Sequence, residues 1–199
     1  MKVLIAGATG NTGARLVSEL AERGHHPVAL IRESSDTSVL PDTAEQRLGD
    51  LTDLQDDVAS DCEVVVFAAG SGGDTSAEMT DKVDRDGAID LIDKAEKNGV
   101  RRFVMLSSVG TENPDPDSDL AHYLQAKHDA DEHLKASDLE YAILRPVSLT
   151  DDGPTGSVIL GDDVDPEGKA ARGDVAVLLA DAVEQDGWKG AVRLMQTDY

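Results

Sequence analysis

Short runs of consecutive apolar residues alternate along the chain with stretches in which apolar residues recur every three or four positions. The runs predict strands that are buried on both faces, and the wider spacing predicts amphipathic helices between them. The predicted strands cover residues 3–6, 28–31, 45–48, 64–68, 103–106, 141–144 and 191–195. Helices are predicted up to Gly24, around 88–97, over about 119–136 and over about 173–184. This alternation indicates an α/β fold, a doubly wound parallel sheet with helices on both faces.

Three stretches rich in glycine and aspartate interrupt this alternation and are predicted to be loops. They cover residues 70–74, 113–118 and 150–168. The chain of 199 residues leaves little room for a second domain, so we expect one domain over residues 1–199. A substrate pocket would then be built from loops near residues 71–77, 109–118 and 148–168.

A glycine-rich turn closes the first predicted strand and opens the first helix. It reads Gly7-Ala8-Thr9-Gly10-Asn11-Thr12-Gly13. The first glycine suits a tight turn, the second lets the backbone approach a pyrophosphate, and the third lets the helix pack close to the strand. The free N–H groups at the helix start then face the anion. The context predicts a Rossmann-type dinucleotide site whose cradle consists of Gly7, Thr9, Gly10, Asn11, Thr12 and Gly13.

The spacing of these glycines resembles the fingerprint of atypical short-chain dehydrogenases/reductases, which include NmrA-like and biliverdin-reductase-B-like NAD(P)H-binding proteins. The resemblance extends from Lys2 to Met195. It implies that Asp50 and Leu51 lie at the adenine, that Ala68, Ala69 and Gly70 lie at the ribose and nicotinamide half, and that the turn at Pro146 lies beside the nicotinamide. It also implies that the segment from Ala171 to Ala176, which contains Arg172, has an architectural role.

The residue after the second predicted strand bears on the choice of dinucleotide. NAD-specific sites place an acid there for the ribose 2′-hydroxyl, whereas this chain has Arg32. A guanidinium can hold a 2′-phosphate through two hydrogen bonds, which favours NADP(H) over NAD(H). The alternative for Arg32 is a surface ion pair with Glu33 or Asp36.

A candidate catalytic set follows the fifth predicted strand. Ser107 and Ser108 end that strand, and Tyr123 and Lys127 follow at the spacing that places two residues on one helix face. The stripe of that helix, which includes Leu120, predicts that Tyr123 and Lys127 point inward. The set resembles the Ser/Tyr/Lys residues of short-chain dehydrogenases, with Ser108 on the substrate carbonyl and Ser107 as the second candidate.

The resemblance implies a role for each of these residues. Tyr123 would donate a proton to the alkoxide that hydride transfer leaves, and the Lys127 ammonium would assist it and hold the nicotinamide ribose. The alternative is a core tyrosine beside a lysine whose amine reaches solvent. This chain departs from the family at Asp84, where an asparagine often completes the proton relay.

Three functions remain open from these residues. The first is an NADP(H)-dependent oxidoreductase that transfers hydride to a small carbonyl, quinone or similar acceptor. The second is an NAD(P)H-binding regulator or redox sensor without turnover. The third is an epimerase or dehydratase that acts on a sugar nucleotide, although the chain after Pro146 is short for the substrate domain of such enzymes.

The charge balance disfavours some classes of binding partner. The 40 acidic residues outnumber the 18 lysines and arginines, which gives a net charge of −22. This field repels nucleic acids and anionic membranes, so we expect a small-molecule substrate and a monomer or homodimer. The single cysteine, Cys62, forms no internal disulfide, and no apolar run is long enough to span a membrane, so we expect a cytoplasmic protein. The histidines and Cys62 lack the spacing of metal ligands, and no metal site is expected.

The excess of aspartate resembles the composition of proteins from salt-accumulating halophiles, and it generates a prediction. Folding brings the negative charges together, and salt screens their repulsion, so the melting temperature should rise with KCl concentration. A thermal melt series from about 0.05 to 3 M KCl spans Debye lengths from above 10 Å to below 3 Å. A parallel series in NaCl controls for a specific cation effect. A melting temperature that stays flat or falls would contradict the halophile interpretation.

Overall fold

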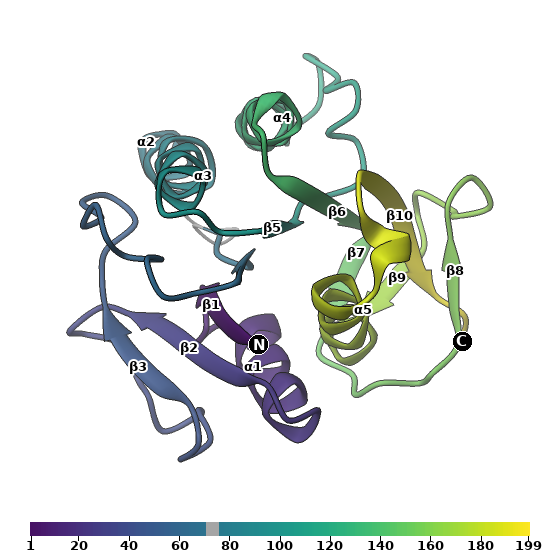
Figure 1. Ribbon diagram of the computed structural model, residues 1–199. Helices are drawn as coiled ribbons and strands as arrows, with labels where there is room; N and C mark the ends of the chain where they lie inside the picture. Colours follow the sequence, from purple (N-terminus) through teal and green to yellow (C-terminus); the bar gives the residue numbers. More distant parts are fainter. Residues whose placement is uncertain (71–75) are drawn as a thin grey trace.

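The computed structural model describes residues 1–70 and 76–199, and its central element is an eight-stranded sheet (Figure 1). The order across the sheet is β3-β2-β1-β4-β5-β6-β10-β8. The strands are β1 (Lys2–Ala6), β2 (His26–Ile31), β3 (Glu45–Leu48), β4 (Val64–Phe67), β5 (Arg102–Leu106), β6 (Glu140–Pro146), β8 (Val158–Leu160) and β10 (Ala191–Thr197). Every pairing is parallel except that of β8 with β10. The chain reverses its winding direction between β1 and β4, which is where ligands bind in such sheets.

Helices cover both faces of the sheet. Figure 1 shows α1 and α5 on one face and α2, α3 and α4 on the other. Their bounds are α1 (Asn11–Glu22), α2 (Ala77–Thr80), α3 (Ala88–Lys97), α4 (Ala121–Ala136) and α5 (Arg172–Glu184), with a π-helical segment η1 (Asp81–Gly87) and a 3₁₀ turn η2 (Asp186–Trp188). Within the parts of the chain that are described, no helix has the length and apolar character needed to cross a membrane.

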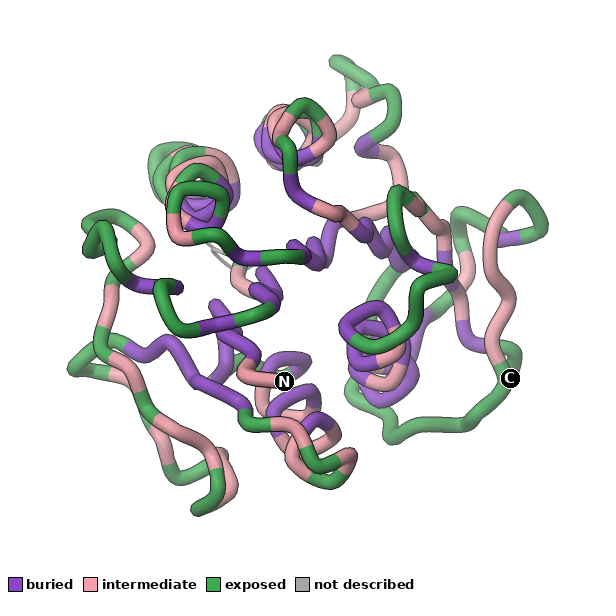
Figure 2. Tube along the Cα trace, in the orientation of Figure 1, coloured by how far each residue is buried: buried purple, intermediate pink, exposed green. Residues whose placement is uncertain are grey.

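Two clusters of buried apolar side chains form the core, one on each face of the sheet. Figure 2 shows buried residues along the central strands and on the helix sides that face them. The cluster below α1 and α5 includes Leu16 and Leu179, and the cluster below α3 and α4 includes Leu91 and Leu134. The predicted doubly wound α/β fold is confirmed, and all seven predicted strands are present with ends that differ by up to two residues.

The prediction that residues 150–168 form one loop is wrong. Val158–Leu160 form β8, which pairs antiparallel with the end of β10 and extends that strand to Thr197. A second, two-stranded sheet joins β7 (Ser148–Thr150) to β9 (Lys169–Ala171). All three strands are only three residues long and lie among glycines and aspartates. β7 and β9 contain no apolar run, and the apolar run of β8 is too short to predict a strand by itself.

One continuous helical segment runs from α2 through η1 to α3. Its middle, Asp81–Gly87, has the wider π-helical winding. A π turn inserts an extra residue into a helix and changes the direction in which neighbouring side chains point, and such turns are frequent at functional sites. Here the buried residues of the π turn are Asp84 and Gly87.

Arg102 of β5 is fully buried and closes the end of α5. Its Nη1 atom donates to the carbonyl oxygens of Ala182 and Gln185, both at 3.0 Å, and its Nη2 atom contacts Glu140 at 3.2 Å. The last carbonyls of a helix have no partner within the helix, so this side chain satisfies groups that would otherwise be buried without one.

Replacing Arg102 by methionine should therefore destabilise the fold. We expect the free energy of unfolding in urea to fall by about 2 kcal/mol, because buried carbonyls lose charged donors. The neighbouring Arg101 supplies a matched control, since its side chain is 44% exposed and pairs only at the surface with Glu140. Arg101→Met should change stability by less than about 0.5 kcal/mol. Equal effects of the two substitutions would contradict the role assigned to Arg102.

Candidate active site

The glycine turn between β1 and α1 has a geometry that only glycine permits at two positions. Gly7 adopts a φ of +81°, and a Cβ there would lie 2.6 Å from the backbone of Ala69 at the end of β4. A Cβ on Gly13 would overlap the carbonyl of Gly7. The turn therefore lies directly against the end of β4, with the start of α1 exposed beside it. This is a cradle that fits a pyrophosphate.

A cavity of about 800 Å³ runs along the carboxyl ends of the strands from this turn. Of the residues predicted to bind the cofactor, those that line it are Gly7, Thr9, Gly10, Asn11, Thr12, Arg32, Asp50, Leu51, Ala68, Ala69, Gly70 and Lys127. Its length along the β1–β4 switch point and its glycine cradle fit a dinucleotide.

Gly13 and Pro146 are not among the cavity-lining residues. Gly13 lies behind the turn, where it allows α1 to approach Gly7. Pro146 is buried at the end of β6, where it pairs with Met195 of β10.

Arg32 lies at the end of the cavity where the adenosine half of a dinucleotide would be. Its side chain is exposed, and its backbone N–H donates to Ser35 Oγ at 3.0 Å. A second hollow of about 480 Å³ adjoins the cavity here and is lined by Arg32, Glu33, Ser34, Leu48, Gly49 and Asp50. Among the ion pairs of the described residues, none joins Arg32 to Glu33 or Asp36.

The Asp50 carboxylate accepts hydrogen bonds from within its own turn. Its Oδ1 atom accepts hydrogen bonds from the Thr52 amide at 2.9 Å and the Thr52 hydroxyl at 2.8 Å, and these bonds hold the pKa of Asp50 below its usual value. The carboxylate therefore serves the turn after β3.

Tyr123 and Lys127 line the same cavity from successive turns of α4. The Lys127 Nζ atom lies 5.4 Å from the centre of the Tyr123 ring, 3.3 Å from the Leu106 carbonyl oxygen and 3.5 Å from Asp84 Oδ1. Lys127 is 5% exposed and Asp84 is 1% exposed. The π turn of η1 thus brings a carboxylate against a lysine that is 43 positions away in the sequence.

The environment of Lys127 keeps its amine protonated. Burial lowers the pKa of Lys127, but the electrostatic effects of Tyr123, Asp84 and Asp131 outweigh it, so the pKa lies above its ordinary value. An ammonium group is therefore available beside the Tyr123 ring.

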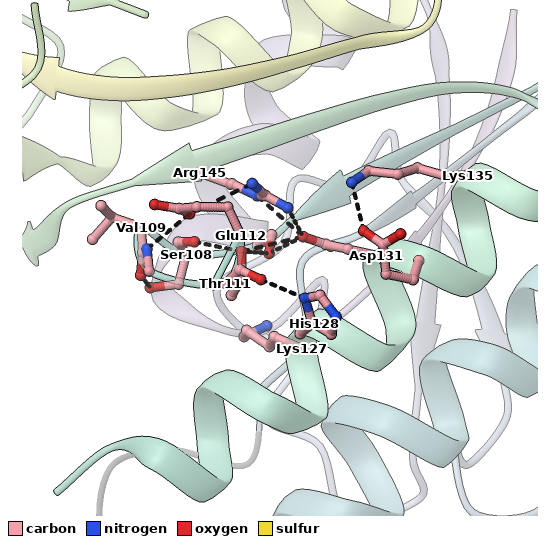
Figure 3. Close-up of polar contacts among 12 residues, drawn as sticks. Ser108, Val109, Thr111, Glu112, Lys127, His128, Asp131, Lys135 and Arg145 are labelled. Atoms are coloured by element: carbon pink, nitrogen blue, oxygen red, sulfur yellow. Dashed lines mark hydrogen bonds and ion pairs between the residues drawn. The ribbon is translucent and has the colours of Figure 1, made fainter. Parts of the chain in front are cut away.

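A buried polar cluster lies one turn further along α4, around Asp131. Figure 3 shows Arg145, Thr111 and Asp131 pointing toward one another. Asp131 Oδ2 accepts from Arg145 Nη2 at 3.0 Å and from Arg145 Nε at 3.2 Å. It also accepts from Ser107 Oγ at 2.8 Å. His128 Nδ1 donates to the Thr111 carbonyl at 2.7 Å. These contacts join α4 to β6 and to the loop after β5.

The two serines at the end of β5 differ in position. Ser107 lines the cavity, but its hydroxyl hydrogen is directed to Asp131, which leaves only acceptor lone pairs for a ligand. Ser108 is not among the lining residues, and its hydroxyl donates to the Val109 carbonyl at 3.2 Å. Both hydroxyls therefore donate to acceptors within the protein, and the cavity brings Tyr123 and Lys127 together with Ser107 instead of Ser108.

Several lining residues were not expected from the sequence. Arg172, expected to be architectural, lines the cavity at the start of α5, with its Nη1 atom 3.0 Å from Asp151 Oδ1. Leu120, expected on the inward stripe of α4, precedes the helix and is 58% exposed at the cavity. Of the predicted substrate loops, 148–168 contributes Leu149 and 109–118 contributes no lining residue. Most of the loop at 71–77 lies outside the described residues.

The fold and this cavity define a Rossmann-type dinucleotide-binding protein. The family model described as NAD(P)H-binding matches residues 7–186, and the chain belongs to this family. The resemblance to NAD(P)H-binding proteins that the glycine turn indicated is thereby confirmed.

Relatives of the chain carry epimerase and oxidoreductase names. The Bacillus subtilis protein "Uncharacterized sugar epimerase YhfK" is 37% identical over 182 residues, which are 88% of this chain and 85% of that protein. A solved structure from Bacillus halodurans, named as an NAD-dependent epimerase/dehydratase, is 36% identical with a TM-score of 0.92 and covers 100% of this chain and 94% of its own. The oxidoreductase ylbE from Lactococcus lactis is 29% identical with a TM-score of 0.87, over 100% and 91%.

Proposed function

We propose that the protein is an NADP(H)-dependent oxidoreductase of the short-chain dehydrogenase/reductase type that reduces a small carbonyl, quinone or similar acceptor. The observation that carries the proposal is the placement of Tyr123 and the buried Lys127 on the wall of the cavity that begins at the glycine turn. A dinucleotide that extended from this turn past Ala69 would bring its nicotinamide end toward these two side chains.

Tyr123, Lys127 and Asp84 have different roles in the proposed reduction. A dinucleotide held along the glycine turn and the end of β4 would supply hydride to the acceptor. Tyr123 donates its hydroxyl proton to the acceptor oxygen, and the phenolate that remains recovers a proton from solvent. The Lys127 ammonium favours this phenolate electrostatically, because it is buried and lies 5.4 Å from the centre of the ring. Asp84 holds Lys127 in that position.

The preference for NADP(H) is supported by the surroundings of Arg32. The guanidinium belongs to both the main cavity and the adjoining 480 Å³ hollow, which offers room for a phosphate at the 2′ position. Ser34 lines the same hollow and supplies a further hydrogen-bond donor. Glu33 lines the same hollow, and its exposed carboxylate weakens the attraction of the hollow for an anion.

The proposed preference for NADP(H) can be tested by titration. Wild-type protein should bind NADPH more tightly than NADH in a fluorescence titration. Arg32→Ala should remove about 1.5–3 kcal/mol of NADPH binding, because one charge-assisted contact is lost, and should leave NADH binding nearly unchanged. Arg101→Ala is the matched control, since Arg101 is exposed and precedes β5 at the amino ends of the strands, away from the cavity at their carboxyl ends. Equal affinities for the two dinucleotides in the wild type would refute the preference.

The proposed role of Tyr123 as proton donor can be tested by substitution. Tyr123→Phe should lower kcat for NADPH-dependent carbonyl reduction by about 10²- to 10⁴-fold, which is the usual contribution of a positioned general acid. The dissociation constant for NADPH should stay within about twofold, because the ring remains and general packing is kept. Tyr141→Phe is the control, since Tyr141 lies near the start of β6, away from the cavity. Unchanged turnover in Tyr123→Phe would show that another group supplies the proton.

A further inference from the structure

Three of the large apolar side chains that the fold leaves exposed line the cavity. They are Met79 of α2, Leu120 before α4 and Leu149 of β7, with exposed fractions of 43%, 58% and 36%. We propose that these residues form the binding site for an uncharged, apolar acceptor, such as an aliphatic aldehyde or a quinone without ionised groups. This inference rests on the proposed function and names its class of substrate.

The position of these side chains separates them from the dinucleotide. The glycine turn, the ends of β2 and β3 and the end of β4 line the part of the cavity that fits the cofactor. The remaining wall comes from α2, η1, the start of α4 and β7, and it contains Tyr123. Met79, Val83, Leu120 and Leu149 therefore lie on the side of the cavity where the molecule that receives hydride would bind.

Exposure of these residues has a cost that a ligand would remove. A leucine or methionine side chain gains about 1.5–3 kcal/mol on full burial, and Leu120 and Met79 forgo much of this in the free protein. Single exposed apolar residues are ordinary on protein surfaces, but a group of them around one cavity indicates a binding site.

The charged groups on the same wall argue against an anionic acceptor. Each cation there already contacts a carboxylate: Lys127 lies 3.5 Å from Asp84, His122 Nε2 lies 3.0 Å from Asp81, and Arg172 lies 3.0 Å from Asp151. Asp119 adds a negative charge to the lining. Within the described part of this wall no cation is left for a phosphate or carboxylate, and the net charge of −22 repels both.

The same lack of unpaired cations disfavours a sugar nucleotide as the acceptor. A sugar nucleotide carries a diphosphate, which proteins bind with arginines, lysines or free backbone N–H groups. The glycine turn provides such a site, but the dinucleotide would occupy it.

A matched pair of alcohols tests the inference without requiring turnover. The chain is loaded with whichever of NADP⁺ and NAD⁺ binds more tightly, and octan-1-ol and 8-hydroxyoctanoate are titrated by calorimetry. The two molecules share the reacting end and the aliphatic chain, and they differ by one carboxylate. Octan-1-ol should bind at least about tenfold more tightly, since the carboxylate would be desolvated without a cation. UDP-glucose, titrated in the same way, should show no binding.

Substitutions at the wall complete the test. Leu120→Ser and Met79→Ser should each weaken octan-1-ol binding by about fivefold to tenfold, because apolar contact area is lost. Val39→Ser is the matched control, since Val39 is 48% exposed and does not line the cavity. NADPH binding should be the same in all three variants.

The outcomes distinguish this inference from the proposed function. Equal binding of the two alcohols, binding of UDP-glucose in their place, or no effect of Leu120→Ser and Met79→Ser would overturn the apolar acceptor site. Octan-1-ol binding that these two substitutions weaken supports the site even when octanal is not reduced with NADPH, and in that case only the oxidoreductase proposal fails.

Discussion

The site depends on a lysine ammonium that is buried away from water and held by a carboxylate. Removing such a charge from water costs several kcal/mol unless a partner of opposite charge is close, and Asp84 provides that partner for Lys127. One turn further along α4, Asp131 forms a second buried ion pair with Arg145. The two pairs fix α4 against both η1 and β6. The position of Tyr123, one turn before Lys127, follows from both.

Charged residues at the surface and in the interior of this protein differ in how they are paired. The surface carries a large excess of carboxylates, many without a cation close enough for an ion pair, whereas Lys127 and Arg145 in the interior each have a carboxylate partner. Salt screens exposed charges strongly and buried pairs weakly. The arrangement around Tyr123 should therefore stay the same over salt concentrations that change the stability of the whole fold.

Features that depend on neighbouring residues in the chain could be predicted from the sequence. The glycine turn follows a strand directly, and Tyr123 and Lys127 share a helix face, so both predictions needed only local geometry. The contact of Asp84 with Lys127 could not be predicted, because it depends on a π turn that has no sequence signal. The direction of the Ser107 hydroxyl also depends on Asp131, which is 24 positions away and looks like any surface aspartate in this acidic chain. Arg172 lies near α1 through Asp151, which pairs with Arg172 and accepts a hydrogen bond from Arg15 of α1 at its backbone carbonyl, a contact between segments far apart in the sequence.

The packing of α1 against α5 affects how the protein is made. Leu16 and Leu20 of α1 are buried in the same cluster as Leu179 of α5, yet more than 150 residues separate them. While the ribosome is still adding the later strands, the apolar side of α1 and one face of β1 have no covering helix. Growing chains with uncovered apolar surface are prone to associate with one another or with chaperones. The excess of acidic residues in the segments that follow β2 repels neighbouring chains during this interval, which ends when α5 docks.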